Sequence, residues 1–101
     1  MKWMIKKTDL QFNILQSLRN CQYRYQHTTD NNEHSFTRVV YNNQPFPRFH
    51  LYVSEVDDKV IFNLHLDQKK SVYEGQTAHS ADYEDPVVTT EYQRIISSLN
   101  G

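Results

Sequence analysis

The sequence predicts an α+β domain with two layers, in which an antiparallel sheet of three or four strands is covered on one face by two helices. Stretches near both ends of the chain carry apolar residues at helical spacing. Two adjacent stretches in the middle alternate apolar with polar residues, which is typical of half-buried strands. The chain has 101 residues, close to the usual size of one domain, so we expect residues 1–101 to form a single α+β domain.

A first helix is predicted over about residues 9–20. The residues TDLQ at positions 8–11 have the form of a capping box, which satisfies free backbone amides at the start of a helix. An apolar stripe at helical spacing follows: Leu10, Ile14, Leu18 and Cys21. Residues 21–27 fit neither helix nor strand clearly, and the turn-forming residues at 28–34 predict a loop.

Three strands are predicted in the middle of the chain. β-branched and aromatic residues at 36–41 favour a short strand, which the two prolines of the segment NNQPFP then end. Residues 48–55 and 59–67 alternate apolar with polar side chains, and the corner between them suits a tight hairpin turn. A fourth strand, at an edge of the sheet, could form around Trp3 and Ile5.

The last third of the chain is predicted to hold a long connection and a closing helix. Residues 68–85 show no periodicity, and connections of this length often carry function. Asp85 followed by Pro86 resembles an N-cap with proline at the first helical position. The closing helix is expected over about residues 86–99, with one apolar stripe: Val88, Tyr92, Ile95 and Leu99.

Composition and charge exclude several classes of protein. The net charge is −1 and the pI is about 6.5, so the chain as a whole has no field that would hold a polyanion. Cys21 is the only cysteine, which excludes an intramolecular disulfide and a cysteine-rich zinc module. No stretch approaches the ~20 apolar residues of a membrane span, and the charged N-terminal residues lack the apolar run of a secretory signal. We therefore expect a cytoplasmic protein that has no contact with a membrane.

The predicted hairpin has two different faces. If Asp57 and Asp58 form a two-residue turn, the turn fixes which residues of the two strands lie opposite each other. Directly opposed residues of an antiparallel pair share a face, so the composition of each face follows. One face is wholly apolar and should be covered by the helices: Phe49, Leu51, Val53, Phe62, Leu64 and Leu66. The other face is polar, and its opposed pairs are Arg48 with Asp67, His50 with His65, and Tyr52 with Asn63.

The polar face of the hairpin holds candidate metal ligands. His50 and His65, side by side, could reach one metal ion, one phosphate or one shared proton. A zinc site would use both histidines with either His79 or Asp67 as the third ligand, and it would leave one position open for water. The chain has no compact ligand motif such as HExxH.

A phosphodiesterase or RNase is an interpretation of the same face, with or without a metal. In the metal-free form, the catalytic candidates are His50 and His65 as general base and acid, with Lys69 or Arg48 stabilising charge on the phosphate. The sequence has no GxSxG nucleophile motif. Its two glycines cannot build a phosphate-cradling loop, which excludes hydrolysis of nucleotides by a P-loop.

Ligand binding without catalysis is the main hypothesis. The polar face would hold an anionic or metal-linked ligand, and the connection that follows could fold back over it. The candidate ligand-binding residues lie on the strands and on that connection: Arg48, Tyr52, Asn63, Tyr73 and Tyr83. Tyrosines on such a surface can stack single-stranded bases, so a small anionic ligand and a single-stranded nucleic acid both fit.

Two further interpretations stay open. A half-exposed sheet face needs polar residues in any case, and Arg48 with Asp67 is then a cross-strand ion pair worth about 0.2–1 kcal/mol. The chain could also be a protein-interaction module that pairs with a partner through an exposed edge of its sheet.

About half of the chain also resembles known sequences. The resemblance lies within residues 47–95, in the segments PRFHLYV, IFNLHLDQKKSVYEG, AHSADY and EYQRI. These are similar to short uncharacterised bacterial proteins that contain HLHLDQK and AHS stretches. The resemblance implies a bacterial or phage origin, and it implies no activity, cofactor or functional residue.

Overall fold

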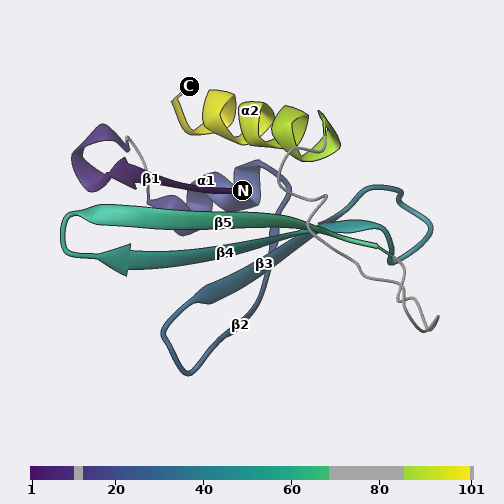
Figure 1. The fold of residues 1–101 in the computed structure, drawn as a ribbon, viewed down its shortest axis with the longest axis horizontal. Coiled ribbons are helices and arrows are strands. Elements are labelled where there is room, and N and C mark those ends of the chain that lie inside the picture. Colours follow the sequence, from purple (N-terminus) through teal and green to yellow (C-terminus); the bar gives the residue numbers. More distant parts are fainter. Residues whose placement is uncertain (11–12, 69–85, 101) are drawn as a thin grey trace.

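A five-stranded antiparallel sheet with two helices makes up the fold (Figure 1). The computed structural model describes residues 1–10, 13–68 and 86–100. The elements, in chain order, are β1 (Lys2–Lys6), a short 3-10 helix (Lys7–Asp9), α1 (Ile14–Asn20), β2 (Arg24–Thr28), β3 (His34–Val39), β4 (Arg48–Val56), β5 (Lys59–Asp67) and α2 (Pro86–Asn100). The strands lie side by side in the order β1-β5-β4-β3-β2. The predicted α+β class with two helices is confirmed.

The number of strands was predicted too low, because the sheet has five rather than three or four. β1 pairs with β5 at one edge, and it contains Trp3 and Ile5, the two residues considered for a fourth strand. β2 lies at the other edge, in the segment that the sequence left open. All β2 side chains are exposed, and a bulge between Tyr25 and His27 interrupts the pairing. A strand without a buried alternating face leaves no periodic signal in the sequence.

The hairpin of β4 and β5 has the predicted register. Asp57 and Asp58 form the turn, and His50 lies directly opposite His65. Asp57 has a φ of 57°, in the left-handed region that aspartate tolerates better than most residues. A slip by one residue would have moved every side chain of one strand to the opposite face, so the register decides which residues the helices cover.

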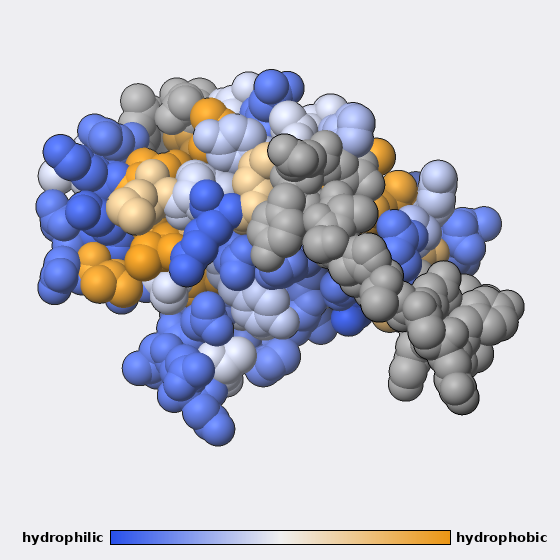
Figure 2. Space-filling view, viewed as in Figure 1, coloured by the Kyte–Doolittle hydropathy of each residue, from blue (hydrophilic) through white to orange (hydrophobic). Residues whose placement is uncertain are grey.

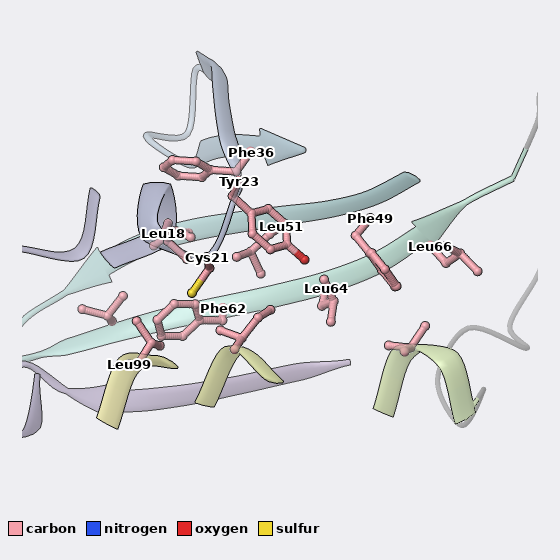
Figure 3. Packing of buried hydrophobic residues seen from close by; sticks show 14 residues of the cluster. Leu18, Cys21, Tyr23, Phe36, Phe49, Leu51, Phe62, Leu64, Leu66 and Leu99 are labelled. Atoms are coloured by element: carbon pink, nitrogen blue, oxygen red, sulfur yellow. The ribbon is translucent and has the colours of Figure 1, made fainter. Parts of the chain in front are cut away.

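The hydrophobic core lies between the sheet and the two helices (Figure 3). Every apolar residue that was predicted for the covered face of the hairpin is buried there. The whole buried cluster consists of Leu18, Cys21, Tyr23, Phe36, Phe49, Leu51, Val53, Val60, Phe62, Leu64, Leu66, Val88, Ile95 and Leu99. Burying one large apolar side chain stabilises a fold by about 1.5–3 kcal/mol, so this cluster is the main source of stability.

α1 begins later than predicted. The side-chain oxygen of Asn13 accepts hydrogen bonds from the backbone amides of Leu15 (2.9 Å) and Gln16 (3.4 Å), so Asn13 is the N-cap. Thr8, the expected cap, belongs instead to the short 3-10 helix. Asparagine is at least as good an N-cap as threonine, which explains why the later signal prevails.

The end of α1 turns the chain into the core. The amides of Gln22 and Tyr23 donate hydrogen bonds to the carbonyl oxygens of Arg19 (2.9 Å) and Leu18 (3.0 Å), which are the paired bonds of a Schellman motif. Gln22 takes the left-handed conformation that this motif requires, with a φ of 75°. The next residue, Tyr23, is thereby buried.

α2 begins at Pro86 and buries most of its predicted stripe against the sheet and α1. Tyr92, which is partly buried, packs edge-on against Trp3 with ring centroids 4.6 Å apart. The expected N-cap, Asp85, lies outside the described residues. Within the described parts of the chain, neither helix is long and apolar enough to cross a membrane.

Candidate functional site

The outer face of the sheet, which is the side opposite the helices, carries polar side chains at its middle. Directly paired residues of antiparallel strands project to the same side, so the strand registers assign each residue to a face. Two rows of side chains cross the middle of the outer face. Together they form what we name the polar band: His65, His50, Thr37 and Arg24 in one row, and Lys2, Asn63, Tyr52, Ser35 and His27 in the other.

Toward the turn between β4 and β5, the outer face carries apolar side chains together with two lysines, Lys6 and Lys59. Met4, Ile61 and Val56 lie on this face near the turn between β4 and β5. Figure 2 shows apolar surface gathered at this end of the molecule, whereas the projecting hairpin of β2 and β3 is mostly hydrophilic. Polar ligands are therefore expected at the middle of the outer face and toward β2.

Three rings lie next to one another at the centre of the polar band. The rings of His50 and Tyr52 are stacked, with centroids 4.3 Å apart and an angle of 25° between their planes. Tyr52 also meets His65 edge-on, with centroids 6.1 Å apart. The two histidines thus lie side by side, as the hairpin register predicted, and a tyrosine ring contacts both.

Hydrogen bonds to both ring nitrogens hold His50 in place. Its Nδ1 lies 3.1 Å from Oδ2 of Asp67, and its Nε2 lies 2.6 Å from Oγ of Ser35. An ionised carboxylate can only accept hydrogen bonds, so Nδ1 carries the proton and donates to Asp67. In the neutral ring, Nε2 then accepts the hydrogen bond that the Ser35 hydroxyl donates. His50 is therefore fixed in one orientation and one tautomer.

Asp67 forms the centre of the charged part of this site. The hydrogen bond from His50 lowers the pKa of the Asp67 carboxyl group, partial burial opposes this shift, and Arg48 lowers the pKa further. Nε of Arg48 lies 3.4 Å from Oδ2 of Asp67, and the Arg48 guanidinium lies over the ring of Phe46. The cross-strand pair of Arg48 and Asp67 is thus present as predicted, and it extends to His50.

The atoms from Ser35 through His50 to Asp67 follow the order found in serine hydrolases, where histidine takes the serine proton and a carboxylate orients the histidine. Ser35, however, is wholly buried, with 0% of its surface exposed. It also lies inside β3, which pairs with β2 and β4, so the backbone amides around it serve the sheet and cannot form an oxyanion hole. The arrangement positions His50 and presents no nucleophile.

The polar band is positively charged. Lys2 and Arg24 lie exposed at its two ends, on β1 and β2, and no residue of the band is acidic. Burial raises the pKa of Tyr52, and the charges of Asp67 and Glu33 raise it further. The Tyr52 hydroxyl therefore stays protonated and can donate a hydrogen bond to an anionic ligand.

The predicted zinc ligands receive no support from the sheet. Both ring nitrogens of His50 are engaged, by Asp67 and by Ser35. Within residues 1–10, 13–68 and 86–100, no group of three His, Cys, Asp or Glu side chains could hold a metal ion. His79, the other candidate for the third ligand, lies outside the described residues.

The other predicted residues divide into two groups. Tyr52 and Asn63 belong to the polar band, and Arg48 lies beside it on the outer face. The candidates on the long connection lie outside the described residues: Lys69, Tyr73 and Tyr83. The fold-back of residues 69–85 over the polar face therefore stays a prediction.

The sequence-based reasoning missed the contribution of β3 and β2 to the site. Ser35 holds His50, and Oγ1 of Thr37 accepts a hydrogen bond from the side chain of Gln26 (2.8 Å). The available signal was the alternation of Ser35 and Thr37 around the apolar Phe36, which places both hydroxyls on the face opposite the core.

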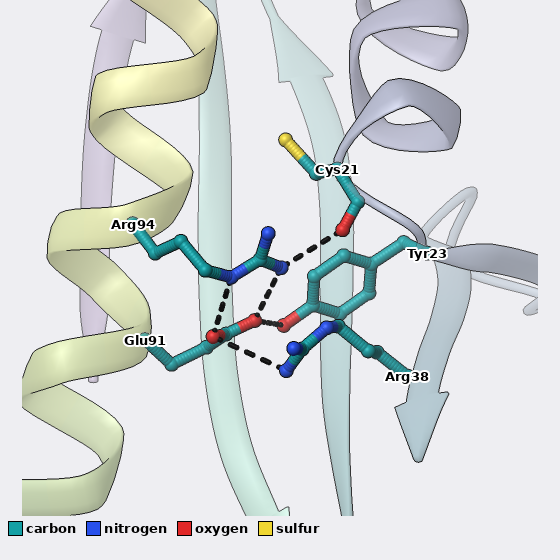
Figure 4. A network of polar contacts seen from close by, with 5 residues as sticks. All are labelled: Cys21, Tyr23, Arg38, Glu91 and Arg94. Atoms are coloured by element: carbon teal, nitrogen blue, oxygen red, sulfur yellow. Dashed lines mark hydrogen bonds and ion pairs between the residues drawn. The ribbon is translucent and has the colours of Figure 1, made fainter. Parts of the chain in front are cut away.

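A second polar cluster lies on the other side of the sheet, within the core (Figure 4). Glu91 of α2 accepts hydrogen bonds from the Tyr23 hydroxyl (2.7 Å) and from Nε and Nη2 of Arg94 (2.8 and 2.9 Å). Arg38 of β3 adds a contact of 3.4 Å, and Arg94 also donates to the carbonyl oxygen of Cys21 (2.8 Å). The cluster ties α2 to β3 and to the end of α1.

The charges of this second cluster stabilise one another. Burial raises the pKa of Tyr23 well above its ordinary value, and the neighbouring Glu91 carboxylate raises it further. The hydrogen bonds to Glu91 raise the pKa of Arg94. Tyr23 therefore stays a hydrogen-bond donor and Arg94 stays charged across the whole accessible pH range.

Comparison of the chain with protein-family models, with curated proteins and with solved structures finds no match. The resemblance of residues 47–95 to short bacterial proteins therefore stays a prediction. Function has to be inferred from the geometry of the two faces of the sheet.

Proposed function

We propose that the outer face binds single-stranded nucleic acid across the polar band. The observation that carries this proposal is a row of rings at the centre of the band with a cation at each end. Neighbouring strands lie about 4.8 Å apart, so Lys2 on β1 and Arg24 on β2 are separated by roughly 19 Å across the sheet. One small anion cannot contact both cations, whereas an extended chain of phosphates can.

The rings at the centre suit unpaired bases. His50, Tyr52 and His65 are partly exposed, and the ring contacts and the bonds to His50 hold them in place before any ligand arrives. Stacking of a base on an aromatic side chain contributes about 1–3 kcal/mol and tolerates any base. Rings that are already ordered lose little entropy on binding, so the band favours single strands, whose bases are accessible.

The overall net charge does not oppose this ligand. At ~0.1 M salt, charges are screened beyond about 10 Å, so a ligand responds mainly to the side chains near it. The acid Glu91 lies on the helix side with its own arginines, and Glu55 pairs with Lys7 (2.9 Å). The acid beside the polar band, Asp67, pairs with Arg48, and Glu33 acts on Tyr52 from nearby. The charges that belong to the band itself are those of Lys2 and Arg24, at its two ends.

Binding is favoured over cleavage. A metal-free phosphodiesterase needs one histidine as general base and another as general acid. His50 has both nitrogens engaged within the protein, so it has none left for a substrate. We expect RNA that is incubated with the protein to remain intact.

Fluorescence anisotropy with a labelled oligouridylate tests the proposal. Replacing Tyr52→Leu removes the central ring and should weaken binding about tenfold or more, since one stacked base is worth about 1–3 kcal/mol. The matched control is Tyr25→Leu, an exposed tyrosine on the helix side of the same sheet, which should leave the affinity unchanged. Saturable binding that both variants share equally would contradict the proposed site.

The salt dependence gives a second, independent readout. For single strands, each neutralised phosphate contributes about −0.7 to the slope of log affinity against log salt. Lys2→Gln and Arg24→Gln should each reduce the slope by about this amount. Lys6→Gln is the control, because Lys6 lies on the same strand and the same face but outside the band. If no oligonucleotide binds even at low salt, the proposal is wrong, and pairing of a protein partner with a sheet edge becomes the leading hypothesis.

A further inference from the structure

The helix side of the sheet holds a pocket that has no part in the function proposed for the outer face. It lies between α1 and the hairpin of β2 and β3, and its volume is about 690 Å³. Pockets that bind small molecules commonly measure about 300–1,000 Å³. The residues that matter for its chemistry come from all three elements: Leu15, Arg19, Arg24, Tyr25, His34 and Phe36.

Apolar side chains form the wall of the pocket. Phe36 is buried, and Tyr25 contacts it edge-on with ring centroids 5.7 Å apart. Tyr25 is nevertheless 54% exposed, and Leu15 is 46% exposed. Large apolar side chains that face water in a concave site gain free energy when a flat apolar ring displaces that water.

The positive charge of the pocket has no counter-ion in the described chain. Arg38, Arg48 and Arg94 each contact a carboxylate. Neither guanidinium of Arg19 and Arg24, by contrast, has an ion pair or a hydrogen bond within residues 1–10, 13–68 and 86–100. None of the described residues that line the pocket is acidic. The side chain of Arg24 projects to the outer face, so the guanidinium beside the apolar wall is that of Arg19. A guanidinium without an ion pair among the described residues favours a ligand that carries an anionic group.

The pocket is held in shape without a ligand. The Tyr25 hydroxyl lies 2.6 Å from Oγ1 of Thr28, and Oγ1 of Thr28 lies 2.9 Å from Nδ1 of His34. This chain of hydrogen bonds fixes the ring of Tyr25 beside Phe36. A ligand would therefore not have to order these side chains, which lowers the entropic cost of binding.

We propose that this pocket binds a small molecule that combines one planar aromatic ring with one anionic group, a carboxylate or a phosphate. The ring packs against Leu15, Tyr25 and Phe36, and Arg19 holds the anionic group. The site is separate from the polar band, with which it shares Arg24 alone. Its occupant is a small molecule, whereas the polar band takes an extended chain.

An NMR titration of the backbone amides tests this proposal. The probes are naphthoate and adenosine monophosphate, and their neutral counterparts are naphthylmethanol and adenosine. We expect the anions to shift the signals of Leu15, Tyr25 and His34 in a saturable way. We also expect the anions to bind about tenfold more tightly than the neutral compounds, because a hydrogen bond to a charged group contributes enough free energy for a difference of that size. A preference for one of the two anions would distinguish a carboxylate from a phosphate ligand.

Two variants locate the site. Arg19→Gln, on the exposed side of α1, should weaken the binding of both anions about tenfold and leave the neutral compounds unaffected. Lys2→Gln, in the polar band, should leave the binding of naphthoate unchanged, so that failure of one site is distinguishable from failure of the other. Equal affinity for anions and neutral compounds, an unchanged affinity of Arg19→Gln, or no saturable shift at millimolar probe would each overturn the proposal.

Discussion

Two carboxylates, one on each side of the sheet, organise the polar chemistry of this molecule in different ways. Glu91, on the helix side, is 4% exposed and accepts hydrogen bonds from a tyrosine and from arginine side chains. Asp67, on the outer face, is 31% exposed and accepts hydrogen bonds from a histidine and an arginine. Both hold a ring and at least one guanidinium, yet only Asp67 keeps a side open to water.

The difference in exposure separates a structural role from a binding role. A buried carboxylate must have partners, because an unpaired buried charge costs several kcal/mol. The carboxylate of Glu91 is almost wholly buried among its partners, although the guanidinium groups of Arg38 and Arg94 are partly exposed. The carboxylate of Asp67, by contrast, is itself partly exposed beside the polar band, so its pair with Arg48 can respond to a ligand at modest cost in stability.

The largest expected effect is that of Glu91→Gln. The substitution keeps the size of the side chain but removes its charge, which leaves Arg94 and Arg38 near the core without a counter-ion. We expect the free energy of unfolding to fall by about 3–5 kcal/mol, as measured by urea titration. The control is Glu55→Gln, which removes the exposed pair with Lys7 and should cost about 0–1 kcal/mol. Equal losses in the two variants would remove the distinction between the clusters.

A smaller loss is expected for Tyr23→Phe. This substitution removes one hydrogen bond to the buried carboxylate of Glu91, and bonds to charged groups are worth about 1.5–3 kcal/mol. Tyr25→Phe is the matched control, because its hydroxyl contacts Thr28 at the surface and its loss should cost well under 1 kcal/mol. Urea titrations of both variants measure the difference. A loss from Tyr23→Phe as small as that of the control would show that Glu91 is satisfied by its arginines alone.

The sequence predicted the parts of the fold that rest on periodicity. The alternation of β4 and β5 and the Asp57-Asp58 turn were enough to derive the register, and with it the neighbouring positions of His50 and His65. The strand β2 was not predicted, because none of its side chains is buried and no apolar pattern marks it. Local patterns report only on what a segment buries.

Contacts between distant segments were the part that could not be predicted. Tyr23 and Glu91 lie 68 positions apart, so no residue near Tyr23 in the sequence indicates its partner on α2. The Schellman turn that buries Tyr23 is local, but Gln22 takes the left-handed position where glycine is usual, so the sequence does not mark it. Ser35 lies next to His50 only because β3 pairs with β4 in one particular register. Long-range pairing of this kind follows from the packing of the whole domain.

The contribution of Asp67 should depend on pH. Because its pKa is lowered in the folded state, Asp67 adds stability that is present above its ordinary pKa and is lost as the pH falls through the lowered value. At neutral pH we expect Asp67→Asn to cost about 1 kcal/mol, as measured by urea titration at several pH values. We expect this cost to decline as the pH falls below about 4 and to vanish only once the pH lies below the lowered pKa. Asp30→Asn, in an exposed loop, should show no such dependence. A cost that stays constant down to acidic pH would mean that the charge of Asp67 is not what stabilises the cluster.

The smallest effect is expected for Ser35→Ala, which decides whether the outer face positions a histidine or activates a nucleophile. Losing the hydroxyl that donates to Nε2 of His50 should cost about 1 kcal/mol or less in a urea titration, because His50 remains partly exposed and water can replace the bond. The native protein should not react with a fluorophosphonate probe, since the Ser35 hydroxyl is buried and no oxyanion hole surrounds it. Thr37→Val, which removes the neighbouring hydroxyl of β3, serves as the control in both measurements. Labelling of the native protein that Ser35→Ala abolishes and Thr37→Val preserves would make Ser35 a nucleophile, and the outer face would then be a catalytic site.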